Sequence, residues 1–151
     1  MAVEIERKFL VTGSAPMENG VEMVQGYLCY DTERTVRIRR EGDRAVITVK
    51  GKSVGISRLE FEYEIPLKDS ELMMKLAVGP LVEKTRYYHK AGKHTWEIDV
   101  FKGGNAGLIV AEIELKFEDE EFEKPEWLGQ EVSGDRKYSN SALSQSPFSS
   151  W

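Results

Sequence analysis

Residues 58–65 read Arg-Leu-Glu-Phe-Glu-Tyr-Glu-Ile, a strict alternation of charged and apolar side chains. Successive side chains of a β-strand point to opposite faces, so one face of this segment is charged and the other is apolar. The same alternation recurs along most of the chain, whereas apolar residues at helical spacing are scarce. Eight antiparallel strands can close into a barrel, so we predict a mainly β (α+β) fold. The predicted strands span residues 2–10, 23–30, 34–40, 44–52, 58–66, 82–88, 94–102 and 108–117.

Three short helices are predicted outside these strands. One follows Asp69, an N-cap residue that precedes an apolar stripe ending at Ala77. The others are expected over residues 119–124 and 135–143. A chain of 151 residues has room for one compact domain, which we place at residues 1–143. Residues 144–151 are small and polar apart from two aromatic side chains, so a loosely held tail is expected there.

The composition excludes several classes of protein. No apolar run approaches the roughly 20 residues that span a bilayer, so no membrane partner is expected. The formal net charge of −5 argues against a surface built to bind nucleic acid. Acidic residues in the opening stretch 1–11 are incompatible with a signal peptide, and Cys29 is the single cysteine, so a cytoplasmic location is predicted.

Two motif-like patterns are set aside. Gly51-Lys52-Ser53 resembles the end of a P-loop, but Val46 stands where that motif requires a glycine. His89 and His94 have no cysteine or carboxylate at zinc-site spacing, so both are expected at the surface.

The charged faces of the predicted strands are unusual because residues of the same sign occupy the same strand. Surface charges are normally interspersed, and like charges that are neighbours on a sheet face destabilise it. The apolar residues between them would need cover, which we expect from the helices. Acidic residues alternate at positions 4/6, 60/62/64, 97/99 and 112/114, and basic residues alternate at 37/39, 50/52 and 84/86.

For any one strand taken alone, the simpler interpretation is that its charged face is exposed to water. If the barrel turns these faces inward, the gathered carboxylates need cations, and oxygen ligands favour Mg²⁺ or Mn²⁺ over zinc. Gathered arginine and lysine side chains suit a chain of phosphates. A metal beside a basic cradle indicates phosphoryl chemistry.

The segment Glu4-Ile5-Glu6-Arg7-Lys8-Phe9 resembles the ExExK signature of the CYTH superfamily, the triphosphate tunnel metalloenzymes. That superfamily includes class IV adenylate cyclases and thiamine triphosphatases. Similar segments follow in family order over residues 3–143, among them 37–39, 58–62, 83–87, 96–101, 111–114 and 138–140. The resemblance implies an eight-stranded antiparallel barrel that forms a tunnel, a small-molecule triphosphate substrate, Mg²⁺ or Mn²⁺ as cofactor, and a homodimer.

The resemblance also assigns roles to residues on the inward face. The metal ligands it implies are Glu4, Glu6, Glu112 and Glu114. The phosphate-binding residues it implies are Lys8, Arg37, Arg39, Lys50, Lys84 and Arg86, with Arg136 and Lys137 closing over one tunnel mouth. Those expected to take part in the chemical step are Lys8, Glu60, Glu62 and Lys84.

Several activities are compatible with this site. We favour a metal-dependent hydrolase of triphosphates, with inorganic tripolyphosphate as substrate and nucleoside triphosphates as further candidates, because the loops are short and none carries the aromatic and amide residues that read a purine. A class IV adenylate cyclase, which makes cyclic AMP and pyrophosphate from ATP, is the first alternative. The others are a thiamine triphosphatase and a polyphosphate-binding module without catalysis, against which the four carboxylates argue.

Overall fold

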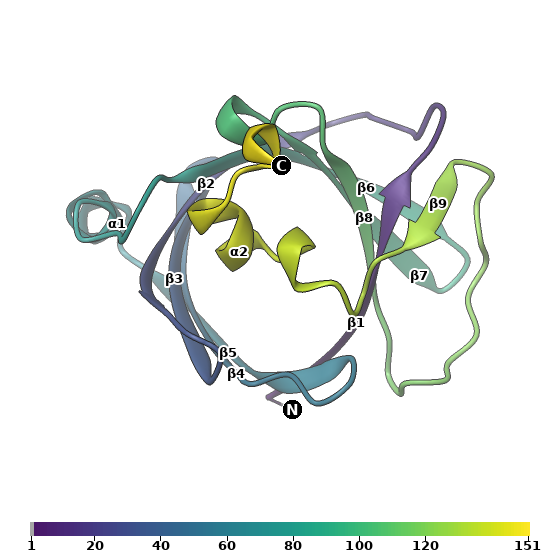
Figure 1. Ribbon diagram of the computed structural model, residues 1–151, viewed down its shortest axis with the longest axis horizontal. Helices are drawn as coiled ribbons and strands as arrows, with labels where there is room; N and C mark the ends of the chain where they lie inside the picture. Colours follow the sequence, from purple (N-terminus) through teal and green to yellow (C-terminus); the bar gives the residue numbers. More distant parts are fainter. Residues whose placement is uncertain (1) are drawn as a thin grey trace.

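The computed structural model describes residues 2–151, and its strands form one antiparallel sheet that closes on itself (Figure 1). Eight strands of the described chain follow one another in the order β5-β4-β3-β2-β6-β7-β8-β1, and β1 pairs with β5 to complete the barrel. The predicted closed antiparallel barrel is therefore confirmed. The bounds are β1 (Val3–Val11), β2 (Val21–Tyr30), β3 (Arg34–Glu41), β4 (Arg44–Gly51), β5 (Ser57–Ile65), β6 (Val82–Ala91), β7 (His94–Phe101) and β8 (Ile109–Glu114).

A ninth strand, β9 (Leu128–Glu131), lies outside the barrel and pairs with the end of β1. The sequence did not predict it, because four residues carry too little alternation to be distinguished from a loop. Within residues 2–151, no helix is long and apolar enough to cross a membrane.

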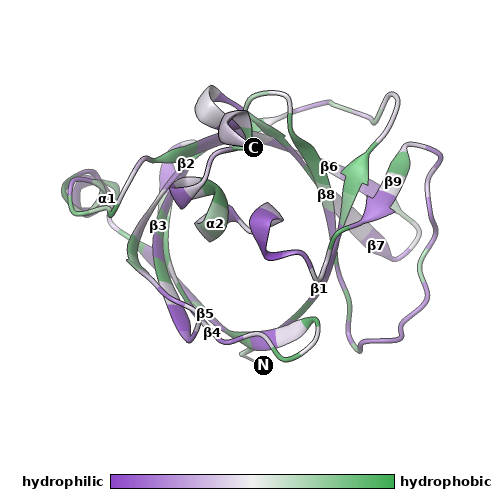
Figure 2. Cartoon of the chain, viewed as in Figure 1, coloured by the Kyte–Doolittle hydropathy of each residue, from purple (hydrophilic) through white to green (hydrophobic). Residues whose placement is uncertain are grey.

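The register of the sheet places the charged residues on one face. Lys8 lies opposite Glu112 across β1 and β8, and Lys50 lies opposite Glu60 across β4 and β5. Hydrophilic and hydrophobic positions alternate along the barrel strands (Figure 2). The charged set faces the interior of the barrel, so the apolar set faces outward.

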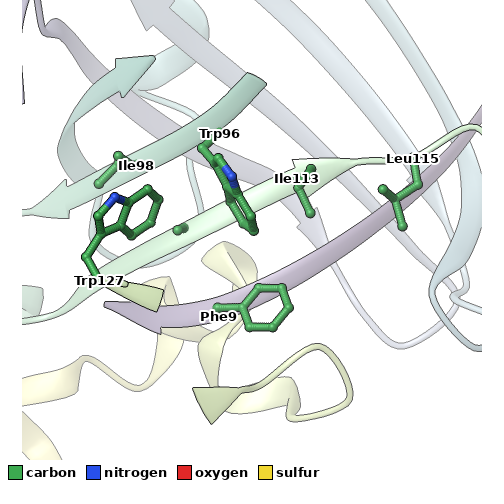
Figure 3. Packing of buried hydrophobic residues seen from close by; sticks show 7 residues of the cluster. Phe9, Trp96, Ile98, Ile113, Leu115 and Trp127 are labelled. Atoms are coloured by element: carbon green, nitrogen blue, oxygen red, sulfur yellow. The ribbon is translucent and has the colours of Figure 1, made fainter. Parts of the chain in front are cut away.

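The outward face of β1, β7 and β8 carries the first hydrophobic core (Figure 3). Trp96 and Ile98 of β7 are fully buried beside Phe9 of β1, and all three side chains belong to one cluster with Trp127. The ring of Trp96 meets those of Phe9 and Trp127 edge to face, with centroids 5.7 and 5.6 Å apart. The cover over this side of the barrel is the segment that follows β8.

That covering segment contains no helix, so the predicted helix at 119–124 is wrong. Glu120 is instead held by its side chain, which accepts the backbone N–H of Lys116 at 2.6 Å and meets Nε2 of His94 at 2.8 Å. Phe122 packs its ring against Trp96, 5.8 Å between centroids. These contacts fix the segment without helical hydrogen bonds. They also bury His94, which the sequence placed at the surface.

Much of the outward face of β4 and β5 has no such cover, contrary to the expectation that helices would shield it. Val49, Leu59, Phe61 and Tyr63 are 36%, 52%, 39% and 62% exposed. The helix nearest in sequence, α1 (Leu67–Met74), lies beside the barrel against β3 and β4, and its Met74 approaches Gly26 of β2.

Helix α1 begins before the predicted cap at Asp69. Pro66 occupies the N-cap position, and Asp69 lies in the first turn, where its carboxylate favours the positive end of the helix. After the helix the chain packs closely on β2, because a Cβ added at Gly26 would lie 2.9 Å from the Cβ of Ala77. Glycine at position 26 permits that approach.

The C-terminal segment crosses one end of the barrel (Figure 1). It comprises the 3-10 turn η2 (Arg136–Tyr138), helix α2 (Asn140–Gln145) and the 3-10 turn η3 (Phe148–Ser150). The predicted helix over 135–143 is thus divided in two, because the side chains of Asp135 and Ser139 each cap a separate turn.

Part of the barrel interior at this end is apolar. Val82, Phe101 and Val110 share the inward face with charged residues of their own strands, and they form a second core with Leu143 of α2. Phe148 packs on this core, and its backbone N–H donates to Oδ1 of Asn105 at 2.9 Å. The last residues are therefore packed, where the sequence predicted a loosely held tail.

Candidate active site

The interior of the barrel holds a cavity of about 140 Å³ that is almost entirely polar. Charged side chains of both signs line it in equal number among the described residues. The carboxylates are Glu4, Glu6, Glu60, Glu62, Glu97, Glu112 and Glu114, and the cations are Lys8, Arg37, Arg39, Lys50, Arg58, Lys84 and Arg86. A wider cavity of about 400 Å³ adjoins it at one mouth and shares Glu4, Glu6 and Lys8 with it.

The structure brings three carboxylates of the barrel wall together. One oxygen each of Glu6, Glu97 and Glu112 lie within 4.8 Å of one another, so a single ion could contact all three. Two of these residues belong to the metal set that the resemblance implied. Of the other two in that set, Glu4 is buried against cations, with Lys50 Nζ at 3.2 Å and Arg58 Nε at 3.5 Å, and Glu114 is exposed at the cavity wall.

The charges around this cluster are not balanced. Burial and the neighbouring carboxylates of Glu112 and Glu4 raise the pKa of Glu6 well above its usual range. Burial would raise the pKa of Glu112 too, but Lys8, Arg86 and Lys84 outweigh it and hold that pKa well below the usual range. Glu112 is therefore ionised while Glu6 resists ionisation. A cation placed between them would favour the charged form of Glu6.

The two glutamates of β5 expected in the chemical step occupy different surroundings. Burial and a hydrogen bond with Glu4 raise the pKa of Glu60 to about 7, which suits a group that exchanges protons near neutral pH. Glu62 accepts from Thr48 Oγ1 at 3.0 Å and lies 3.8 Å from the guanidinium groups of both Arg37 and Arg39. Glu62 therefore serves as a counter-charge for the arginines.

On the opposite wall, Asp99 holds two of the predicted phosphate-binding residues. Its carboxylate accepts from Nε and Nη2 of Arg86 at 2.7 and 2.9 Å, and from Nζ of Lys84 at 2.8 Å. Asp99 is fully buried. Burial lowers the pKa of Lys84 to about 7 despite the attraction of Asp99. Asp99 thus contacts both cations, and Nη1 of Arg86 lies in addition 3.4 Å from Glu97.

The remaining basic residues approach the cavity from β1, β3 and β4. Lys8 Nζ lies 3.5 Å from Glu112 and donates to the carbonyl oxygen of Tyr138 at 3.1 Å. Arg37 is 7% exposed, donates from Nη2 to Thr48 Oγ1 at 3.2 Å, and has no acceptor for Nε among residues 2–151. Arg39 donates to Glu41, with Nη2 to Oε1 at 3.2 Å.

The two basic residues predicted to close the tunnel mouth are separated by the structure. Arg136 lines the wider cavity at the mouth. Lys137 points elsewhere, with its Nζ 4.6 Å from the centre of the Trp151 ring and 5.4 Å from that of Tyr138. Lys137 therefore lines neither of the two cavities described here and belongs to an aromatic contact with the end of the chain.

Sequence reasoning assigned no role to four residues that the structure places at this site. Glu97, Asp99 and Arg58 were recognised as inward-facing by their alternation, but the strand pattern cannot say which inward residues meet. Asn140 accepts hydrogen bonds from Lys84 and Gln25. Its only signal in the sequence was its place in the matched segment 138–140.

The donor set fits a hard divalent cation. All the candidate ligands are carboxylates, and no histidine or cysteine lines the cavity within the described part of the chain. Oxygen donors alone suit Mg²⁺ or Mn²⁺ and disfavour zinc. At Glu6, burial and the carboxylates of Glu112 and Glu4 outweigh the nearby Lys50 and Lys8 and raise the pKa, an environment that a divalent ion would correct.

Comparisons with known proteins agree with this geometry. The CYTH domain model matches residues 2–147. A protein of Acetivibrio thermocellus named inorganic triphosphatase is 47% identical, over 98% of this chain and 97% of its own length. One of Nitrosomonas europaea with the same name is 38% identical, over 95% of this chain and 97% of its own length. A crystal structure of an inorganic triphosphatase superposes with a TM-score of 0.68 at 36% identity, over 95% of each chain.

Proposed function

The chain belongs to the CYTH domain family, and on that premise we propose that it is a metal-dependent inorganic triphosphatase that hydrolyses tripolyphosphate. The observation that carries the proposal is a cluster of three carboxylates that lies beside basic side chains in one barrel cavity. Glu6, Glu97 and Glu112 bring one oxygen each within 4.8 Å of one another. Lys84 and Arg86 bind Asp99 next to this cluster, and Nη1 of Arg86 also lies 3.4 Å from Glu97. A linear polyanion with a bound divalent cation matches both the carboxylates and the cations of this cavity.

The acidic cluster is the proposed metal site. Glu6 and Glu112 are the ligands on which the implied set and the geometry agree, and Glu97 joins them by its position. Glu4 and Glu114 complete the proposed set from the adjoining wall. When bound, Mg²⁺ or Mn²⁺ neutralises charge on phosphate oxygens and lowers the pKa of a coordinated water.

The basic residues hold and orient the substrate. Arg37, Arg39, Lys50 and Arg86 contribute charge from strands β3, β4 and β6, and Arg136 stands at the mouth through which a triphosphate would enter. The transition state of phosphoryl transfer is loose, so positioning and charge neutralisation supply most of the catalysis. Lys8 and Lys84 neutralise the developing charge, and Glu60, with its pKa near 7, accepts a proton from the attacking water.

We expect the purified protein to release phosphate from tripolyphosphate with Mg²⁺ or Mn²⁺, and to do so faster than from ATP, thiamine triphosphate or long-chain polyphosphate. The physical reason is that the small cavity is lined almost entirely by charged and polar groups, which bind phosphates and offer a base or thiazole ring little apolar surface. A phosphate-release panel with EDTA controls measures this. Cyclic AMP as the main product from ATP, or equal rates in EDTA, would contradict the proposal.

The proposal includes a cytoplasmic location, supported by the single free cysteine, Cys29.

A homodimer is also part of the proposal, and the support is the uncovered outer face of β4 and β5, where Leu59, Phe61 and Tyr63 stay exposed. Light scattering should give twice the chain mass of 17.2 kDa. The double substitution Phe61→Glu and Tyr63→Glu should reduce it to one chain, because carboxylates would be buried in the interface. A wild-type mass of one chain would rule the dimer out.

A further inference from the structure

Two hydrogen bonds fix the orientation of the Lys84 side chain inside the barrel. The residue is 1% exposed, and its Nζ donates to Oδ2 of Asp99 at 2.8 Å and to Oδ1 of Asn140 at 3.0 Å. An ammonium group has three N–H donors, so two are engaged and one remains. Because Lys84 lines the cavity, that third donor is available to a ligand there.

The Asn140 side chain is itself fixed. Its Oδ1 also accepts from Nε2 of Gln25 at 2.7 Å, and Gln25 is fully buried in β2. Asn140 is the first residue of α2, directly after Ser139, whose side chain caps the helix by accepting from the N–H of Ala142. The hydrogen bond from Gln25 and the capped start of α2 therefore hold the amide next to Lys84.

The chemical nature of this acceptor matters because the neighbouring acceptor is charged. Asp99 is a carboxylate that accepts from both Lys84 and Arg86, and Glu97 lies 3.4 Å from Arg86 as well. A further carboxylate at position 140 would add negative charge beside Lys84, whereas an amide oxygen orients the ammonium without adding any. A neutral acceptor is thus the one that keeps this wall attractive to a polyanion.

We propose that Asn140 is a positioning residue, which fixes the direction of Lys84 in the cavity while leaving its positive charge available to the phosphate chain. The inference rests on the proposed function for the identity of the ligand. The preceding turn treats the second lysine in the same way, since the carbonyl oxygen of Tyr138 accepts from Lys8. The segment 138–140 therefore orients both lysines with uncharged oxygen atoms.

The end of the chain holds this segment in place. The ring of Trp151 meets those of Tyr138 and Phe148 edge to face, with centroids 5.2 and 5.0 Å apart. Phe148 is anchored in turn on the second core and on Asn105. This packing keeps the acceptors of residues 138–140 over the cavity.

The test compares Asn140→Ala and Asn140→Asp with the control Gln145→Ala. Gln145 lies in the same helix but bonds to the carbonyl oxygen of Val78, and it lines neither cavity. Calorimetry measures tripolyphosphate binding in EDTA, and steady-state assays with Mg²⁺ separate KM from kcat. Lysine ¹⁵N NMR follows the slowly exchanging ammonium of Lys84, assigned by its loss in Lys84→Gln.

We expect Asn140→Ala to weaken binding and raise KM by roughly tenfold, and to remove the Lys84 ammonium signal. Asn140→Asp should weaken binding further while retaining that signal, because a carboxylate still accepts the hydrogen bond but repels the polyanion. Gln145→Ala should match the wild type. Wild-type affinity in Asn140→Asp would overturn the proposal, as would an equal loss in Gln145→Ala, which would indicate a purely structural role.

The failure of the proposed function would look different. A wild-type protein that binds tripolyphosphate without hydrolysing it would refute the triphosphatase activity, and the binding data would still decide the role of Asn140. If the wild type does not bind tripolyphosphate, the Lys84 ammonium signal in the NMR spectrum still tests whether Asn140 positions Lys84. Its persistence in Asn140→Ala would overturn the positioning role, and its loss there with retention in Gln145→Ala would support that role.

Discussion

Glu6→Gln is expected to lower kcat/KM for tripolyphosphate by about 1000-fold or more, while making the metal-free protein more stable at neutral pH. The loss of activity follows because Glu6 is one of three carboxylates whose oxygens lie within 4.8 Å of one another, and an amide is a much weaker ligand for Mg²⁺. Steady-state kinetics and the Mg²⁺-induced rise in melting temperature measure the two consequences of losing the ligand.

The gain in stability follows from the raised pKa of Glu6. Burial, Glu112 and Glu4 all raise it, so the folded protein binds a proton at Glu6 more tightly than the unfolded chain does. The resulting stabilisation is complete below the pKa of an unfolded glutamate, about 4.3, and is lost as the pH rises through the folded pKa. Glutamine imitates the protonated form at every pH. In EDTA, the variant should therefore melt above the wild type near pH 7, and the difference should vanish near pH 4.

Glu64→Gln is the matched control. Glu64 belongs to an acidic run of alternating residues as Glu6 does, but it is exposed, pairs with Arg44 at 3.3 Å and does not line the cavity. Its removal should leave both the kinetics and the Mg²⁺ response unchanged. Substantial turnover in Glu6→Gln, or a metal-free Glu6→Gln protein that melts below the wild type at pH 7, would contradict the metal assignment.

The parts of the fold that the sequence predicted are those set by local alternation. Residues 58–65 expose one charged and one apolar face whatever they pair with, and the same pattern in the other strands, together with the family resemblance, predicted a closed barrel with a charged interior. The covering segment 115–127 could not be predicted in this way. Its course depends on Glu120 reaching His94 and on Phe122 reaching Trp96, contacts between residues more than twenty positions apart.

The candidate site likewise has a part that local alternation predicted and a part that depends on contacts between distant residues. Alternation identified the inward charges, and every acidic residue predicted at the site lines the cavity. It could not show that Glu97 meets Glu6, since those residues come from strands that are separated in the chain. Asn140 lies outside the barrel strands altogether, and its contact with Lys84 exists only because the end of the chain packs across the barrel.

Arg37→Ala should raise KM for tripolyphosphate by about 100-fold with a smaller effect on kcat, because Arg37 offers the substrate a donor that nothing else satisfies. The side chain is 7% exposed, and its Nε has no acceptor among residues 2–151. A buried N–H without a partner is costly, so a phosphate oxygen that accepts it gains more than a contact made at the surface. The apparent KM should also become less sensitive to salt, since fewer charges attract the substrate.

Arg37→Lys separates charge from geometry. Lysine keeps the positive charge but lacks the planar fork and its Nε donor, so KM should still rise by about tenfold. Arg44→Ala is the control, because Arg44 begins the neighbouring strand β4, is exposed and does not line the cavity. An Arg37→Lys protein with wild-type KM would mean that charge alone binds the substrate there. An unchanged KM in Arg37→Ala would mean that the phosphate chain lies against the other basic residues, and that the orphaned Nε belongs to the folded protein and not to substrate binding.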